Sequence, residues 1–154
     1  DNKAVSVGIN DKDVKMTFML ADLSVIRQVP DLKNTPDWNV SIDLTKEFTN
    51  RFIKAKNALP ESENFGIKCT GDSAEVITNY SSINNNRIKF DFDVTNATEM
   101  PVTCFSSNLF KEILNANKDA ETGKLEVSAA GLARVTFSSK TYSATYYLVQ
   151  LQAS

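Results

Sequence analysis

The sequence repeats one order of predicted elements, and this order constrains the fold more than any other feature. Strands are predicted where apolar and polar residues alternate, and helices where apolar residues recur every three or four positions. The first unit has predicted strands at residues 38–44, 65–70, 74–80 and 87–94, with a helix at residues 46–59 after the first strand. The second has strands at residues 101–105, 124–129, 132–138 and 142–151, with a helix at residues 108–117 after the first strand. We therefore predict an α+β domain with antiparallel sheets and two strand-helix-three-strand repeats.

The ends of the two predicted helices carry capping signals. Thr45 precedes the first helix and Pro60 follows it, while Ser106 or Ser107 precedes the second. A shift of 61 positions aligns the two helices. It places Phe48 on Leu109, Phe52 on Ile113, Ile53 on Leu114 and Ala55 on Ala116. We predict that these apolar residues face the core.

The N-terminal part of the chain is predicted to be separate from these repeats. Two short alternating runs flank the polar residues 10–13, which predicts a hairpin over residues 1–20. Residues 21–37 contain Pro30 and Pro36 and show no sustained period, so they are predicted to be an extended connector. The chain begins with Asp1 rather than Met, and we expect a fragment or a processed product.

The composition disfavours most kinds of enzyme. The chain has no histidine, which excludes catalytic triads with a histidine base and zinc sites with histidine ligands. Asp91 and Asp93 alternate with Phe90 and Phe92, as expected for the solvated face of a strand. Cys69 and Cys104 lie in alternating apolar runs and are predicted to be buried and unpaired. We expect no catalytic residue, no metal and no cofactor, and no stretch approaches the roughly 18 apolar residues that span a bilayer.

Positive charge is concentrated on the predicted helices, although the net charge of the chain is -2. The predicted outer faces are Lys46, Asn50, Lys54 and Asn57 on the first helix and Ser107, Lys111, Asn115 and Lys118 on the second, and neither contains an acidic residue. Lys and Asn suit loose, sequence-independent contact with a nucleic-acid backbone. The alternative is that these residues are ordinary solvated positions of two helices.

Four stretches of the second repeat carry a family resemblance. They are residues 104–116 (CFSSNLFKEILNA), 123–127 (GKLEV), 132–137 (LARVTF) and 144–149 (ATYYLV). Together they resemble the closing portion of a DNA polymerase sliding clamp, the family of proliferating cell nuclear antigen and the phage accessory clamps, with the phage type nearest. The resemblance implies a homotrimeric ring that encircles duplex DNA in the host cytoplasm. A clamp loader places such a ring on DNA, and the ring tethers the polymerase during replication.

The resemblance also implies domains and sites. Residues 1–20 correspond to the last hairpin of a preceding clamp domain, residues 21–37 to the interdomain connector, and residues 38–154 to the C-terminal clamp domain. The implied DNA-facing residues are Lys46, Asn50, Arg51, Lys54, Lys56, Asn57, Lys111, Asn115 and Lys118. The implied pocket for partner peptides is formed by Val29, Pro30, Leu32, Tyr147, Val149 and Gln150. A strand at residues 87–93 is expected to pair with a neighbouring subunit, and a ring is expected to need a further N-terminal domain.

Two other readings of the sequence remain open. A non-catalytic phage structural or protein-binding module could have the same repeated α+β layout, and it predicts no salt-dependent affinity for DNA. An enzyme would have to rely on carboxylates, lysine or tyrosine alone, and the sequence shows no convergent set of these residues.

Overall fold

The computed structural model describes residues 4–25, 32, 34–71, 73–83, 86–94 and 96–152. The chain divides into two compact units, Asp1–Thr35 and Pro36–Ser154. In the first unit, β1 (Ser6–Asp11) pairs with β2 (Val14–Met19) as an antiparallel hairpin. A short 3-10 helix, Leu23–Val25, follows the hairpin and was not predicted.

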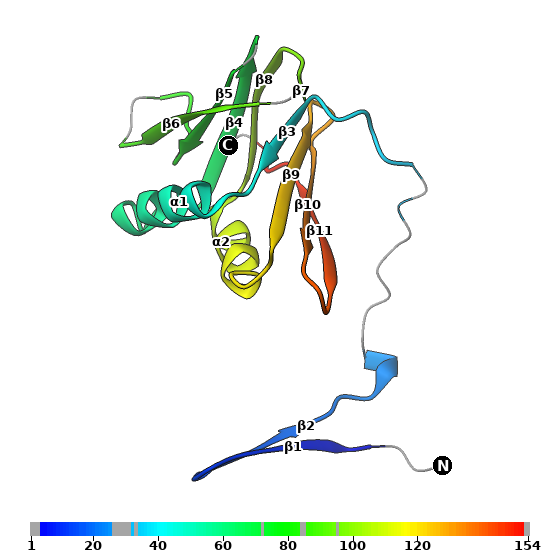
Figure 1. Cartoon of the computed structure of the whole chain (residues 1–154). Coiled ribbons are helices and arrows are strands. Elements are labelled where there is room, and N and C mark those ends of the chain that lie inside the picture. The colour runs from blue at the N-terminus through cyan, green and yellow to red at the C-terminus, as the bar shows by residue number, and fades with distance from the viewer. Residues whose placement is uncertain are drawn as a thin grey trace. The chain divides into compact units, whose positions relative to one another are not determined.

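The second unit contains the two predicted repeats (Figure 1). The elements of the first are β3 (Val40–Asp43), α1 (Lys46–Ala58), β4 (Asn64–Thr70), β5 (Ser73–Thr78) and β6 (Ile88–Asp93). A two-residue strand, β7 (Asn96–Ala97), links the repeats and was not predicted. The elements of the second are β8 (Met100–Ser106), α2 (Ser107–Ala116), β9 (Thr122–Ser128), β10 (Leu132–Ser138) and β11 (Ser143–Val149). The predicted order of elements is therefore confirmed.

The strands of this unit form two antiparallel sheets that exchange their first strands. One sheet has the order β6-β5-β4-β8 and the other the order β11-β10-β9-β3-β7. Thus β3 of the first repeat pairs with β9 of the second, and β8 of the second pairs with β4 of the first. Both helices lie next to each other on the same side of the sheets (Figure 1). Neither repeat completes its sheet alone, so the two repeats form one α+β domain.

A cluster of phenylalanine side chains joins the helices to the sheets. Phe52 of α1, Phe65 of β4 and Phe110 of α2 are all 0% exposed. Their ring centroids lie 4.8 to 5.1 Å apart. Two of these ring pairs are edge-to-face and the pair of Phe65 and Phe110 is stacked, and both kinds of contact add to the stabilisation from apolar burial. Because both helices contribute to the cluster, it fixes them side by side.

The predicted core face of α2 is partly wrong. Leu109 is 58% exposed and Ala116 is exposed, whereas Phe110 is fully buried. The buried positions of the two helices match at a shift of 62 rather than 61, with Phe48 corresponding to Phe110. The N-caps Thr45 and Ser106, by contrast, differ by 61 positions. The first buried phenylalanine therefore lies one residue further from the N-cap in α2 than in α1.

The two cysteines differ in burial. Cys69 is buried, as predicted, whereas Cys104 is only half-buried. Within the described residues, no helix is long and apolar enough to cross a membrane.

Candidate nucleic-acid interface

The outer face of α1 has the composition that the helical period predicts. Phe48, Phe52 and Ala55 are buried on one side of the helix. The four residues of the opposite side are exposed, namely Lys46, Asn50, Lys54 and Asn57. Two ammonium groups and two amides therefore project from one face of α1 into solvent.

The outer face of α2 differs from the prediction. Ser107 is fully buried, and its hydroxyl donates a hydrogen bond of 2.6 Å to the carbonyl oxygen of Ser62. Asn115 and Lys118 are exposed as predicted, but Glu112 is exposed as well. The prediction that this face lacks an acidic residue is therefore wrong. This error arose because the buried face of α2 was predicted one residue too early in the sequence.

Lys111 contributes to the contact between the helices. It is half-buried, and its Nζ donates a hydrogen bond of 2.9 Å to Oδ1 of Asn57. This bond ties α2 to the C-terminal half of α1. The structure thus brings together two of the predicted DNA-facing residues, and uses them in part to hold the two helices beside each other.

Two basic residues of α1 do not join its outer face. Lys56 is only 5% exposed, and its Nζ donates a 2.7 Å hydrogen bond to the carbonyl oxygen of Pro60, so the prediction that its ammonium faces outward is wrong. Arg51 is exposed, but it forms an ion pair with Glu47 one turn earlier. Arg51 also lines a hollow that it shares with Asp91, on the flank of α1 near β6.

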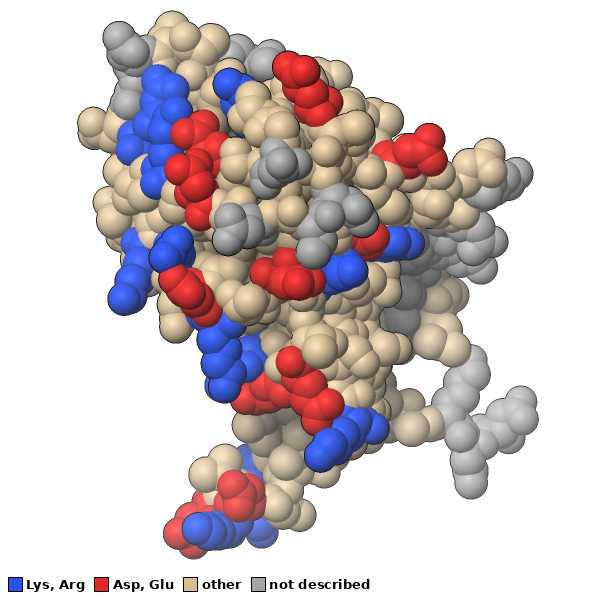
Figure 2. All heavy atoms as spheres, turned by 45° about the horizontal axis from the view of Figure 1, so that its top comes forward, with Lys and Arg blue, Asp and Glu red and all other residues tan. Residues whose placement is uncertain are grey.

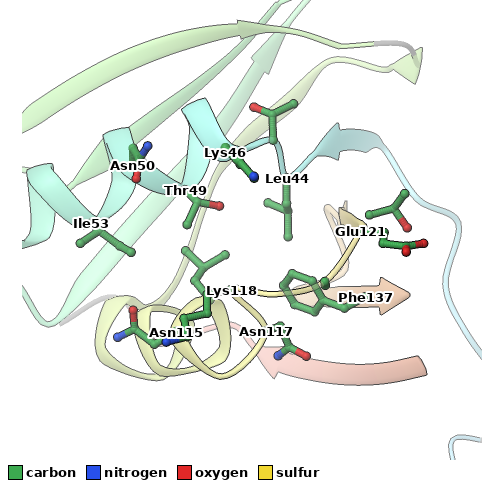
Figure 3. Close-up of a pocket in the computed structure, with 15 residues that line it drawn as sticks. Leu44, Lys46, Thr49, Asn50, Ile53, Asn115, Asn117, Lys118, Glu121 and Phe137 are labelled. Atoms are coloured by element: carbon green, nitrogen blue, oxygen red, sulfur yellow. The ribbon is translucent and has the colours of Figure 1, made fainter. Parts of the chain in front are cut away.

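A groove between the two helices is lined by four of the predicted residues. Figure 3 shows Lys46 and Asn50 projecting from α1, and Asn115 and Lys118 from the C-terminal end of α2 and the turn after it. The groove has a volume of about 330 Å³. Glu121 also lines it and lies 3.9 Å from Nζ of Lys140. The ammonium and amide groups of these side chains can donate hydrogen bonds to phosphate oxygens.

The basic character of the molecule is local to these helices. Figure 2 shows one face on which basic and acidic side chains lie close to one another rather than forming separate fields. Among the described residues there is no group of three or more Cys, Asp and Glu side chains that could hold a metal ion.

The implied peptide pocket is described only in part. Val29 and Pro30 lie outside the described residues, and Leu32 belongs to the first unit, where it is 47% exposed. On the second unit, Tyr147 and Val149 share the solvent face of β11 and are 40% and 71% exposed. Gln150 follows the strand and is exposed.

One feature of this sheet face was missed from the sequence. The guanidinium of Arg134 lies 4.8 Å from the ring centroid of Trp38, just before β3. Arg134 also forms an ion pair of 2.6 Å with Glu126 and lies opposite Tyr147 in the strand register. This stack fixes the start of the second unit against the sheet, and no local sequence pattern reveals it because the partners are far apart in the chain.

Comparisons with known proteins give a clear result for the fold only. The sequence matches no known protein family and no curated protein. Among solved structures, the proliferating cellular nuclear antigen of Entamoeba histolytica has a TM-score of 0.65 and 16% identity, over 95% of this chain and 59% of that chain. The PCNA2–PCNA3 complex from Sulfolobus tokodaii has a TM-score of 0.71 and 10% identity, over 97% of this chain and 61% of that chain.

A third solved structure extends the likeness. The beta clamp of H. pylori, solved with diflunisal, has a TM-score of 0.59 and 15% identity, over 96% of this chain and 40% of that chain. The chain has a sliding-clamp fold. It spans less than two thirds of each of these clamps.

The two sheets of the second unit have edge strands to which further strands can add, and β6 and β11 are two of them. In the second unit, β6 ends the four-stranded sheet and β11 ends the five-stranded sheet. No strand among the described residues pairs with the outer edge of either. An unpaired edge presents a row of backbone donors and acceptors that another strand can use. The predicted strand at residues 87–93 is thus an edge strand.

Proposed function

We propose that this chain is a subunit, or part of a subunit, of a DNA polymerase processivity factor. The observation that carries the proposal is the groove between α1 and α2, where Lys46, Asn50, Asn115 and Lys118 line one surface of a clamp fold. A ring of such surfaces encircles duplex DNA and holds a polymerase near its template. Tethering of this kind raises the effective concentration of the polymerase and needs no catalysis by the ring.

The chemistry of the two helices suits sliding better than fixed binding. Lysine presents a mobile charge to phosphate, and asparagine bonds phosphate oxygens directly or through water. The two helices carry no dedicated set of base-reading side chains, so we propose that contact is independent of sequence. Lys54 and Asn57 extend this surface along α1, and Lys111 lies beside Asn57.

The first unit supports a larger assembly. Seven apolar side chains share one face of the β1–β2 hairpin because strand register places them together, and they are 44% to 65% exposed. They are Val5, Val7, Ile9, Val14, Met16, Phe18 and Leu20. An apolar face of this extent needs a covering surface. We assign residues 1–20 to the end of a preceding clamp domain, residues 21–37 to a connector and residues 38–154 to the C-terminal domain.

The ring and its partners follow from the same assignment. A homotrimer would close through pairing of β6 with a strand of the next subunit. Polymerase and clamp loader would dock through short peptides that contact the residues implied by the resemblance, namely Val29, Pro30, Leu32, Tyr147, Val149 and Gln150. A phage-encoded protein of this kind would act in the cytoplasm of the host cell.

The test of this function is processive synthesis on a long primed template, using the natural full-length protein with its own polymerase and loader. Lys46→Glu, Lys54→Glu and Lys118→Glu are combined in one variant. We expect shorter products and faster loss from circular DNA, because contacts with phosphate are lost. Each lost contact makes the decrease of log affinity with log salt less steep by about 0.9.

The matched control makes the same change of charge elsewhere. Lys15, Lys68 and Lys124 are exposed lysines outside the two helices, and all three are replaced by glutamate. The control variant is expected to support normal product length. Equal stimulation by both variants would contradict the proposed interface and favour a non-catalytic binding module without a DNA role.

A further inference from the structure

A second cleft lies at the C-terminal end of the second unit and shares no lining residue with the helix groove. It has a volume of about 490 Å³. Its walls come from the turn between α1 and β4, the end of β5, strand β8 and residues 150–152. A cleft of this size admits one or two side chains of a ligand rather than a folded domain.

The floor of this cleft is apolar and depends on a glycine. Val102 and Tyr80 close over Gly66 of β4, which has no side chain to separate them. A Cβ atom at Gly66 would lie 2.6 Å from Cγ1 of Val102 and 3.3 Å from Cβ of Tyr80. The backbone N–H of Leu151 donates a 2.9 Å hydrogen bond to the carbonyl of Cys104, which holds the end of the chain as one wall.

The rim of the cleft is acidic. Glu61 and Glu63 are exposed, and neither forms an ion pair with any residue that the structure describes. The described lining includes no lysine or arginine. Asn64, between the glutamates and the floor, has a buried Oδ1 with no hydrogen-bond partner in the described part of the chain. The cleft therefore combines an apolar floor with uncompensated negative charge at its mouth.

We propose that this cleft binds a short peptide segment of a partner protein in which an apolar side chain adjoins a lysine or arginine. The apolar side chain contacts Val102 and Tyr80, and the cation lies between the carboxylates of Glu61 and Glu63. The cleft includes Gln150, so the proposal rests on the proposed peptide surface and extends it by a cationic subsite. A charge-assisted hydrogen bond gives such a subsite its preference.

The test selects short random peptides on the immobilised full chain and measures their affinity by fluorescence anisotropy. Selected peptides are expected to carry Lys or Arg beside an apolar residue. The variant Glu61→Gln combined with Glu63→Gln is expected to bind them about tenfold more weakly, as for loss of a hydrogen bond to a charged group. Glu99→Gln, an exposed acid outside the cleft, is expected to leave affinity unchanged.

Cys104 gives an independent readout from inside the cleft. Burial raises the pKa of the Cys104 thiol, so it reacts slowly with iodoacetamide at mildly alkaline pH, and Cys69 is fully buried. A selected peptide at saturation is expected to slow alkylation of Cys104 severalfold further. An unchanged rate, or peptides without basic residues, or no peptide selected at all, would overturn the proposal.

Two further variants separate this proposal from the function on which it rests. In one outcome, the selected peptides bind more weakly to the variant Tyr147→Ala with Val149→Ala but normally to the variant Glu61→Gln with Glu63→Gln. This outcome would support the peptide surface and overturn the proposed cleft. In the other outcome, peptide affinity depends on Glu61 and Glu63, but retention on circular DNA does not depend on the helix lysines. This outcome would support the cleft and overturn the clamp function.

Discussion

At the residue scale, two lysines of α1 show how position on the helix decides what a charge can do. Lys54 is exposed on the outer face. Lys56 lies on the flank of the buried stripe, and its ammonium satisfies the carbonyl of Pro60, just beyond the C-terminal end of the helix. A cation at this end also interacts favourably with the helix dipole. The first lysine is available to a ligand and the second stabilises the fold.

Replacing each of these lysines by methionine distinguishes the two roles. Lys56→Met is expected to lower the free energy of unfolding by about 1 kcal/mol, because the Pro60 carbonyl loses its donor. It is expected to leave retention on circular DNA unchanged. Lys54→Met is expected to show the reverse, with stability changed by less than about 0.5 kcal/mol. Urea unfolding and DNA retention measure the two effects, and a shared loss of DNA retention would contradict the assignment.

The sequence predicted the exposed residues of α1 because one helical period determines them. Lys46, Asn50, Lys54 and Asn57 follow from the positions of the phenylalanines alone. The burial of Lys56 could not be predicted, since it depends on the path of the chain beyond Pro60. The contact of Lys111 could not be predicted either, because its partner Asn57 is 54 residues away in the chain.

At the element scale, each end of α2 was predicted to within one residue, but its buried face was partly wrong. Ser106, one of the two caps that the sequence allowed, accepts a hydrogen bond from the backbone N–H of Leu109 and so caps the helix. Leu109 and Phe110 are adjacent apolar residues, so two rotations of the helix fit the pattern almost equally well. Tertiary contacts decide between them, because Phe110 fills the space between Phe52 and Phe65.

The buried hydroxyl of Ser107 gives a prediction at this scale. Ser107→Ala is expected to cost about 1–3 kcal/mol, because the buried carbonyl of Ser62 loses a hydrogen bond that water cannot replace. Asn108→Ala, at the exposed neighbouring position, is the control and is expected to change stability by less than about 0.5 kcal/mol. Equal unfolding midpoints for the two variants in urea would show that the link between Ser107 and Ser62 adds nothing.

At the scale of the whole molecule, the exchange of first strands between repeats makes the second unit cooperative. The repeat was visible in the sequence, but the exchange was not, since strand pairing over long separations leaves no local pattern. Because β3 and β8 each complete the other repeat's sheet, neither sheet can form without both repeats. The clamp domain is therefore one folding unit, and the groove between its helices is set by both sheets.

Phe52→Ala tests this cooperativity. Removing a fully buried phenylalanine from the cluster is expected to cost about 3–5 kcal/mol. Hydrogen exchange of the most protected amides is expected to accelerate equally in β4 and in β9, although Phe52 contacts Phe65 of β4 directly. Acceleration confined to the sheet that contains β4 would indicate two independent units.

The most direct test of the central claim asks which face of the second unit lies against DNA. A photocrosslinking amino acid is placed either at Asn50, in the helix groove, or at Thr136, on the face of β10 opposite the core. The full-length protein is loaded on circular duplex DNA and irradiated. We predict crosslinks to DNA from position 50, lost when the circle is linearised, and none from position 136. Crosslinks from position 136 at an equal or higher yield would contradict the account.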